Sequence, residues 1–311
     1  MSFASEVKEE VTRLELDDRT KKGELSALIK MLSTLSFSGG QIHAKISSKN
    51  ATVIKLVSQH LQSLYDNHPD LAFVKEERLY RSNIYVLRIT DSVREIMNDL
   101  DLWSEAGLMT HPRMKFLKND NMVRGYLMGC FLANGSVNDP VKTNYHLEIK
   151  VDDEDHGEFI IKLLQKFYLN ARLAPRRNHF IVYIKASEQI SDFLRLIGAS
   201  DAVFEYEDIR IQRDFMNSFS RLNNCEIAND AKSMKVAQEQ YEAVGFLIDS
   251  GHIAKLSDKD QEMAMLRYKN PEATLMELSR IYSEATGTVL SKSGIRHRFA
   301  KIMEMAEKYR G

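Results

Sequence analysis

The stretch Arg124–Val137, R-G-Y-L-M-G-C-F-L-A-N-G-S-V, decides the fold of this chain. It contains no proline and is apolar on nearly all sides, which is typical of a helix buried in a core. Gly125, Gly129 and Ala133 follow one another at intervals of four, so they line one face of that helix. Each interior glycine costs about 1 kcal/mol of helix propensity relative to alanine. Such a helix usually needs close approach to another backbone, so the sequence predicts a tightly packed partner.

A second helix has the same spacing of small residues 102 positions earlier. Gly23, Ala27 and Met31 stand there within the stretch G-E-L-S-A-L-I-K-M-L-S. We predict that the two helices pack face to face. The shared spacing also suggests that the chain contains a duplication.

The segments that follow each of these helices support the duplication, because they recur in the same order. Alternating apolar residues predict strands, and apolar residues three or four apart predict helices. The expected segments are Gln41–Ser47, Thr52–Tyr65, Leu71–Glu76, Asn83–Ile89 and Ser92–Leu100 in the first repeat, and Asn144–Val151, Asp153–Tyr168, Ala171–Arg176, His179–Ile184 and Ser187–Ile197 in the second. Each repeat reads α-β-α-β-β-α, and the fold class is α+β.

The composition is that of an ordinary globular protein. The 311 residues are 43% hydrophobic and 28% charged, with a net charge of −1. No apolar run approaches the roughly 18 residues that span a membrane. Cys130 and Cys225 both lack a C-x-x-C partner, so neither a disulfide framework nor a zinc site is supported. A reducing cytoplasm fits best, and we expect no metal, no cofactor and no membrane contact.

The region Asp208–Gly251 joins two parts of the chain. Asn217–Asn229 is dense in Asn, Ser and Arg, which favour caps and turns, whereas Ala231–Asp249 reads as a helix. Three arginines of this region could touch a phosphate backbone, although surface or capping roles are favoured for any one of them: Arg210, Arg213 and Arg221.

The end of the chain predicts three capped helices. The first is Ser257–Tyr268, with Ser257 as its N-cap. The second follows Thr274, whose capping box is closed by Glu277. The third is capped by Ser291 and runs to about Lys308. Its buried stripe comprises Ile295, Phe299, Ile302, Met303 and Ala306.

Positive charge gathers on the other side of the third helix. From position 285 to 311 the chain has six basic residues and two acidic residues. This is the layout of a helix-turn-helix, in which the last helix enters the major groove of DNA. The candidate DNA-binding residues are Thr274, Glu277, Ser291, Lys292, Ser293, Arg296, His297, Arg298 and Lys301.

These residues suggest different roles at the interface. The guanidinium of Arg296 matches O6 and N7 of guanine, whereas Lys292 and Lys301 suit phosphates. Arg298 lies between the two faces and can form a salt bridge instead. The turn at positions 285–290 is longer than usual, as in sigma-factor-type helix-turn-helix domains. A small helical module that binds proteins remains the alternative.

The central helix carries a family resemblance. Leu127–Gly135, L-M-G-C-F-L-A-N-G, resembles the LAGLIDADG helix of homing endonucleases, and Leu25–Ser33 resembles a more degraded copy. In those nucleases the penultimate residue of each motif is an acid that holds a divalent metal. Asn134 and Leu32 stand at these positions here, and neither is a good ligand for a hard cation. The resemblance therefore implies the fold without the carboxylates that two-metal phosphodiester cleavage requires.

Two LAGLIDADG-like repeats followed by a helix-turn-helix resemble the WhiA family of bacterial regulators. The more specific segments are F-L-A-N-G-S-V (131–137), H-L-E-I (146–149), Q-I-S-D-F-L-R-L-I-G-A (189–199), N-S-F-S-R-L-N-N-C-E-I-A-N (217–229) and L-S-K-S-G-I-R-H-R (290–298). The resemblance implies a nucleoid-associated protein that binds double-stranded DNA and acts in transcription. It also implies a role in sporulation in actinomycetes, and in cell division or chromosome segregation in other Gram-positive bacteria.

The expected organisation follows from both arguments. It comprises an N-terminal helix (1–20), a first repeat (21–113), a second repeat (114–215), a linker with a helix (216–255) and a helix-turn-helix domain (256–311).

Two further functions remain as alternatives to a non-enzymatic DNA-binding regulator. A residual metal-dependent nuclease would need acids such as Asp139, Asp152 and Asp153, which read better as solvated loop residues. A scaffold would bind regulatory or division proteins through the sheets of the repeats, and it could coexist with DNA binding.

Overall fold

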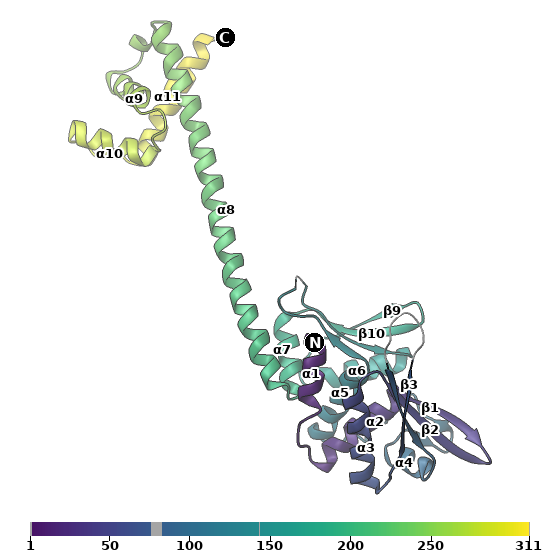
Figure 1. Cartoon of the computed structure of the whole chain (residues 1–311). Helices are drawn as coiled ribbons and strands as arrows, with labels where there is room; N and C mark the ends of the chain where they lie inside the picture. The colour runs from purple at the N-terminus through teal and green to yellow at the C-terminus, as the bar shows by residue number, and fades with distance from the viewer. Residues whose placement is uncertain (1, 76–82, 143, 311) are drawn as a thin grey trace. The chain divides into compact units, whose positions relative to one another are not determined.

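The computed structural model describes residues 2–75, 83–142 and 144–310. The chain divides into two compact units, Met1–Arg213 and Asp214–Gly311. Figure 1 shows the ribbon of the chain, coloured from the N-terminus to the C-terminus. Within the described ranges, no helix combines the length and the apolar character that a membrane span requires.

The first unit contains the duplication, and the α+β class with two LAGLIDADG-like repeats is confirmed. After α1 (Phe3–Val11), the first repeat comprises α2 (Asp18–Leu32), β1 (Ser33–Ser38), β2 (Gln41–Ser48), α3 (Ala51–Tyr65), β3 (Asp70–Lys75), β4 (Asn83–Ile89) and α4 (Val93–Asp99). A short hairpin follows, β5 (Trp103–Ser104) and β6 (Gly107–Leu108). The second repeat comprises α5 (Asp120–Asn134), β7 (Gly135–Val137), β8 (Leu147–Val151), α6 (Glu154–Gln165), β9 (Arg172–Arg176), β10 (His179–Ile184) and α7 (Ser187–Leu196).

The order α-β-α-β-β-α was incomplete, because each repeat has one more strand. β1 and β7 follow α2 and α5 with no intervening residue, so no turn residue marks their start. β7 is only three residues long and becomes a strand through its pairing with β8. The last residue of the strand expected at Leu71–Glu76 lies outside the described residues.

The two sheets have the same topology. Their strand orders are β1-β2-β4-β3 and β7-β8-β10-β9, and all neighbouring strands are antiparallel. In the first sheet Ile46 pairs with Ser33 and Leu87, and in the second Ile149 pairs with Gly135 and Val182. Each central residue is buried, so the shared register places equivalent positions of the two repeats on the core.

The helices α2 and α5 pack side by side through their small residues (Figure 1). A Cβ atom added to Gly23 would lie 2.2 Å from the carbonyl oxygen of Met122, and one added to Gly125 would lie 2.1 Å from that of Thr20. At Gly129 the nearest atom is the carbonyl oxygen of Glu24, at 2.4 Å. Backbone therefore meets backbone, which explains why glycine occupies these positions despite its low helix propensity.

Helix α8 (Ser200–Asp249) contains the boundary between the two units. The turns expected within Asn217–Asn229 were wrong, because these residues continue the helix. No proline occurs in α8, and its only glycine is Gly245, so nothing in the backbone forces an end. The Asn and Ser side chains of the segment are exposed instead of capping a break.

The second unit is a small helical domain. It comprises the end of α8, a 3₁₀ turn η1 (His252–Lys255), α9 (Asp258–Lys269), α10 (Leu275–Thr286) and α11 (Lys292–Arg310). Its core takes residues from each of the four α-helices, including Leu247, Met263, Leu278 and Phe299. Because this core is separate from that of the repeats, the helix-turn-helix has packing of its own.

Candidate nucleic-acid interface

Capping residues determine where α10 begins. The hydroxyl oxygen of Thr274 accepts the backbone N–H of Glu277 at 3.2 Å, and the Glu277 carboxylate accepts the backbone N–H of Thr274 at 2.7 Å. These bonds stabilise the ionised carboxylate, so the pKa of Glu277 lies below its ordinary value. The predicted capping box is present, and it holds both side chains at the start of this helix.

The turn between α10 and α11 has two fixed ends. Gly287 ends α10 with a positive φ of 67°, and its N–H donates to the carbonyl oxygen of Ser283. Ser291 then caps α11, because its hydroxyl oxygen accepts the N–H of Gly294 at 3.2 Å. Between these ends the Leu290 carbonyl accepts a hydrogen bond from the Ser279 hydroxyl. The residue that precedes the Ser291 cap is thereby tied to α10.

Helix α11 has a buried face and an exposed face. Ile295, Phe299, Ile302 and Ala306 are buried in the core of the second unit, and Met303 is partly buried against it. The opposite side of its first three turns is exposed, and it comprises Lys292, Ser293, Arg296, His297 and Lys301. The charged groups of Lys292, Arg296 and Lys301 form no ion pair or hydrogen bond with any residue that the structure describes. Their charges face solvent.

Arg298 lies apart from this exposed set. Its guanidinium donates to the Asp260 carboxylate of α9 at 3.1 Å, and the Arg298 side chain is only 21% exposed. The same carboxylate accepts the Ser257 hydroxyl at 2.6 Å. Arg298 therefore forms a salt bridge, as its position between the two faces allows, and it ties α11 to the N-terminal turn of α9.

Sequence reasoning missed a buried arginine beneath the interface. Arg267 is 1% exposed, and its guanidinium donates to the Gln240 side chain at 3.0 and 3.2 Å. It also donates to backbone carbonyls of the loop between α9 and α10, at Asn270, Pro271 and Ala273. Burial lowers the pKa of Arg267. The side chain orders the loop that leads to the Thr274 cap, and no local pattern separates it from a surface arginine.

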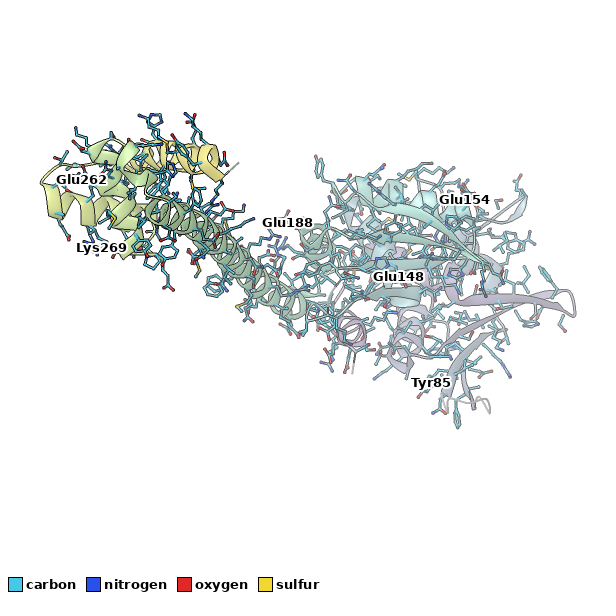
Figure 2. The ribbon with its side chains drawn as sticks, turned by 90° about the horizontal axis from the view of Figure 1, so that it is seen from above. Tyr85, Glu148, Glu154, Glu188, Glu262 and Lys269 are labelled. Carbon is cyan, nitrogen blue, oxygen red and sulfur yellow. The ribbon has the colours of Figure 1, made fainter. Side chains whose placement is uncertain are left out.

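A second contact strengthens the support behind the interface. Tyr282 of α10 donates from its hydroxyl to Glu262 of α9 at 3.4 Å; Glu262 is labelled in Figure 2. The ring of Tyr282 is buried in the same core as Phe299. The orientation of α10 relative to α9 is therefore held by apolar packing and by one polar contact.

The arginines of α8 differ in their surroundings. Arg210 pairs with Glu207 at 2.7 Å and with Glu188, labelled in Figure 2, at 3.3 Å. Arg213 donates to the carbonyl oxygens of Pro140 and Lys142, both at 2.8 Å. These two side chains therefore stabilise the first unit. Arg221 is exposed on α8.

The two positions that the LAGLIDADG resemblance aligns with metal-binding acids lie near each other in the first unit. Leu32 and Asn134 are the last residues of α2 and α5, and both line one cavity together with Lys8 of α1. The Lys8 ammonium lies 5.7 Å from the centre of the Phe131 ring, and burial lowers the pKa of Lys8 to about 8. A lysine thus stands beside the helix ends where the LAGLIDADG resemblance led us to look for carboxylates. In the described part of the chain, no cluster of His, Cys, Asp or Glu could hold a metal ion.

Two of the acids considered for a residual nuclease have structural partners. The Asp153 carboxylate caps α6 by accepting the His156 N–H at 2.8 Å, and it lies 3.5 Å from the Lys30 ammonium. Asp139 accepts the N–H of Val141 at 2.9 Å within a loop. Asp152 is exposed.

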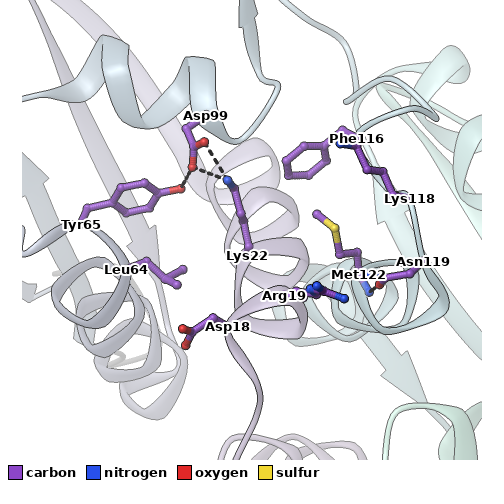
Figure 3. Close-up of a pocket in the computed structure, with 10 residues that line it drawn as sticks. All are labelled: Asp18, Arg19, Lys22, Leu64, Tyr65, Asp99, Phe116, Lys118, Asn119 and Met122. Carbon is purple, nitrogen blue, oxygen red and sulfur yellow. Dashed lines mark hydrogen bonds and ion pairs between the residues drawn. The ribbon is translucent and has the colours of Figure 1, made fainter.

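Another pocket lies at the opposite ends of α2 and α5 (Figure 3). Lys22 reaches Asp99 at 2.6 Å, and the Tyr65 hydroxyl donates to the same carboxylate at 2.7 Å. Burial and this carboxylate raise the pKa of Tyr65 above its ordinary range. The three side chains connect α2, α3 and α4, which gives them a structural role in the first repeat.

The geometry defines a class of protein: two degenerate LAGLIDADG-like repeats that precede a helix-turn-helix domain. Three family models match the chain: the WhiA N-terminal LAGLIDADG-like domain over residues 18–103, the WhiA LAGLIDADG-like domain over 123–216 and the WhiA C-terminal HTH domain over 219–306. The chain belongs to the WhiA family.

Relatives match over the full length. The chain is 39% identical to "Probable cell division protein WhiA" of Lysinibacillus sphaericus over 100% of its length and 98% of the relative. It is 41% identical to the protein of the same name in Staphylococcus epidermidis, with the same coverage. The "Crystal structure of full-length DUF199/WhiA from Thermatoga maritima" has the same fold, with a TM-score of 0.58, 21% identity and 99% coverage of both chains. The family and its helix-turn-helix domain support a DNA-binding regulator.

Proposed function

We propose that this protein regulates transcription by binding double-stranded DNA through α11, without catalysing a reaction. One observation carries the proposal: Lys292, Arg296 and Lys301 project into solvent from the first three turns of a helix whose other face is fixed in a core. A helix of this kind fits the major groove, where its N-terminal residues reach base edges.

The side chains divide by chemistry into base readers and phosphate binders. Arg296 is placed to read guanine, because its guanidinium donates two parallel hydrogen bonds to O6 and N7. Lys292 and Lys301 carry point charges that suit phosphates, which position a protein without reading sequence. Ser291, Ser293 and the backbone N–H groups at the start of α11 add a second phosphate contact. Thr274, Glu277 and His297 complete the proposed contact surface at the start of α10 and on α11.

Fluorescence anisotropy with a specific site and a scrambled duplex tests these roles. Arg296→Ala should weaken specific binding by about 1–3 kcal/mol and leave binding to the scrambled duplex nearly unchanged. Lys301→Ala should weaken both by the same factor. Lys308→Ala removes the same charge two turns further along α11 and should bind like the wild type. If Arg296→Ala and Lys301→Ala also bind like the wild type, the assigned face is wrong.

We further propose that this regulation serves cell division or chromosome segregation at the nucleoid. The relatives named as cell division proteins support this assignment. A genome-wide crosslinking map should show discrete sites for the wild-type protein, and an Arg296→Ala, Lys301→Ala double variant should lose them. Sites that persist in the double variant would contradict it.

The repeats are proposed to lack nuclease activity. Leu32 and Asn134 offer no carboxylate at the ends of α2 and α5, and the nearby Lys8 ammonium opposes binding of a second cation. Plasmid DNA incubated with the protein and magnesium should stay supercoiled. Magnesium-dependent nicking that is lost in Asp139→Asn would overturn this proposal.

A further inference from the structure

Part of α8 exposes large apolar side chains along a single helix. Every residue from Asp214 to Lys232 is exposed, including Phe215 at 68%, Phe219 at 59% and Leu222 at 61%. A lone helix in water is marginally stable, and contiguous exposed apolar side chains mark interaction sites. This segment therefore lacks a packing partner among the described residues of its own unit.

The spacing along this segment indicates what covers it. Phe215, Leu222, Asn229 and Val236 follow one another at intervals of seven, which is the repeat of a coiled-coil seam. Ser218, Cys225 and Lys232 occupy the intervening positions of the same seam. A single asparagine at such a position fixes the register and favours a two-stranded pair. Phe219 lies at the edge of the seam, where its ring can cover the core.

We propose that residues 214–236 of α8 form a parallel, two-stranded coiled coil with a second copy of this chain. Charge complementarity supports this partner. Arg221 and Glu226 are five residues apart, so they do not meet on one helix, where neighbours are three or four apart. In a parallel pair they occupy the two flanking positions that meet across the interface. The two-fold axis makes this ion pair twice.

The parallel arrangement also matches the core residues better than the antiparallel one. It places Phe215, Leu222 and Asn229 of one helix against the same residues of the other. The antiparallel arrangement would place Phe215 against Lys232 and would leave Arg221 opposite Ala228. In the parallel pair Phe215 and Leu222 therefore meet apolar residues, Lys232 meets Lys232 near the end of the segment, and the asparagines can hydrogen-bond to each other.

Sedimentation of the full-length protein without DNA tests the proposal, so its failure is distinct from failure of DNA binding. The wild type should sediment as a dimer, and Leu222→Asp as a monomer. Ile227→Asp places the same charge at an equally exposed apolar position outside the seam, and it should remain dimeric. A monomeric wild type, or dissociation by Ile227→Asp but not by Leu222→Asp, would overturn the proposal.

A charge exchange separates a parallel pair from other assemblies. Arg221→Glu and Glu226→Arg should each raise the dimer dissociation constant several-fold, whereas the double exchange should return it to near the wild-type value. Both side chains are exposed, so folding is not at risk. If the double exchange associates no better than the single variants, the parallel register is wrong.

Oxidative crosslinking gives an independent readout. The chain has two cysteines, of which Cys225 is exposed and Cys130 is buried in the core of the first unit. With a mild oxidant that accepts the two electrons and two protons of the thiols, a parallel pair should form a Cys225–Cys225 disulfide. Cys225→Ser should abolish this covalent dimer. A wild type that yields no covalent dimer would contradict the parallel seam.

Discussion

The substitution Gly125→Ala tests how closely α2 and α5 approach. The added Cβ would lie 2.1 Å from the Thr20 carbonyl oxygen and 2.9 Å from the Thr20 carbonyl carbon. These atoms are backbone, so no side-chain rotation relieves the clash. The helices must separate locally by about 1 Å, and close-packed interiors resist such a shift.

The magnitude follows from opposing effects. Overpacking in a core costs about 1–3 kcal/mol, occasionally more, and a clash between two backbones belongs at the upper end. The better helix propensity of alanine offsets about 1 kcal/mol. We expect a net loss of about 2 kcal/mol, which for a unit of this size lowers its melting temperature by roughly 4–8 °C.

Tryptophan fluorescence measures this loss of stability in the first unit, which contains Gly125. The single tryptophan, Trp103, belongs to the first unit and packs partly buried against its core. Gly157→Ala is the matched control, because its Cβ would clash with the end of the Leu173 side chain, at 2.6 Å, and would otherwise make an ordinary contact with a Val151 methyl group, at 3.4 Å. That side chain can rotate, so the control should change stability by less than about 1 kcal/mol. If Gly125→Ala melts like Gly157→Ala, the helices do not pack as described.

Three further substitutions test buried groups. Burial lowers the pKa of His156 from 6.5 to about 4. The first unit should therefore lose stability as the pH falls from 6.5 to 4. In melts followed by fluorescence, His156→Gln should make stability depend less on pH over this range. Burial lowers the pKa of Lys8 from 10.5 to about 8. Lys8→Met should therefore stabilise the first unit at pH 7 by about 1–3 kcal/mol. The difference in stability between Lys8→Met and the wild type should shrink as the pH rises above 8. Arg267→Met leaves the Gln240 side chain and the loop carbonyls without their hydrogen-bond donor. Amide hydrogen exchange should then show that the free energy of unfolding of α9–α11 falls by about 3 kcal/mol. Unchanged exchange would contradict the role given to Arg267.

The features that sequence predicted are those with local causes. The positions of Gly23 and Gly125, each on one face of its helix, predicted close helix packing. The capping residues Ser257, Thr274 and Ser291 sit at the starts of three helices, as their spacing to the next apolar stripe indicated. Each of these signals lies within a few residues of the structure it specifies.

The features that sequence missed depend on distant contacts or on the absence of a stop signal. β7 is a strand because β8 pairs with it, and three residues carry no periodicity of their own. Lys8 reaches the ends of α2 and α5 from a separate helix. Helix α8 continues through Asn217–Asn229 because composition that favours turns does not break a helix that lacks proline and glycine there.

The salt dependence of DNA binding tests the central claim, that α11 carries the DNA-binding surface, most directly. Each phosphate contact contributes about 0.9 to the slope of log affinity against log salt concentration. The Lys292→Ala, Lys301→Ala double variant should therefore have a slope shallower than that of the full-length wild type by about two. An unchanged slope would show that the positive charges of α11 do not meet the DNA backbone.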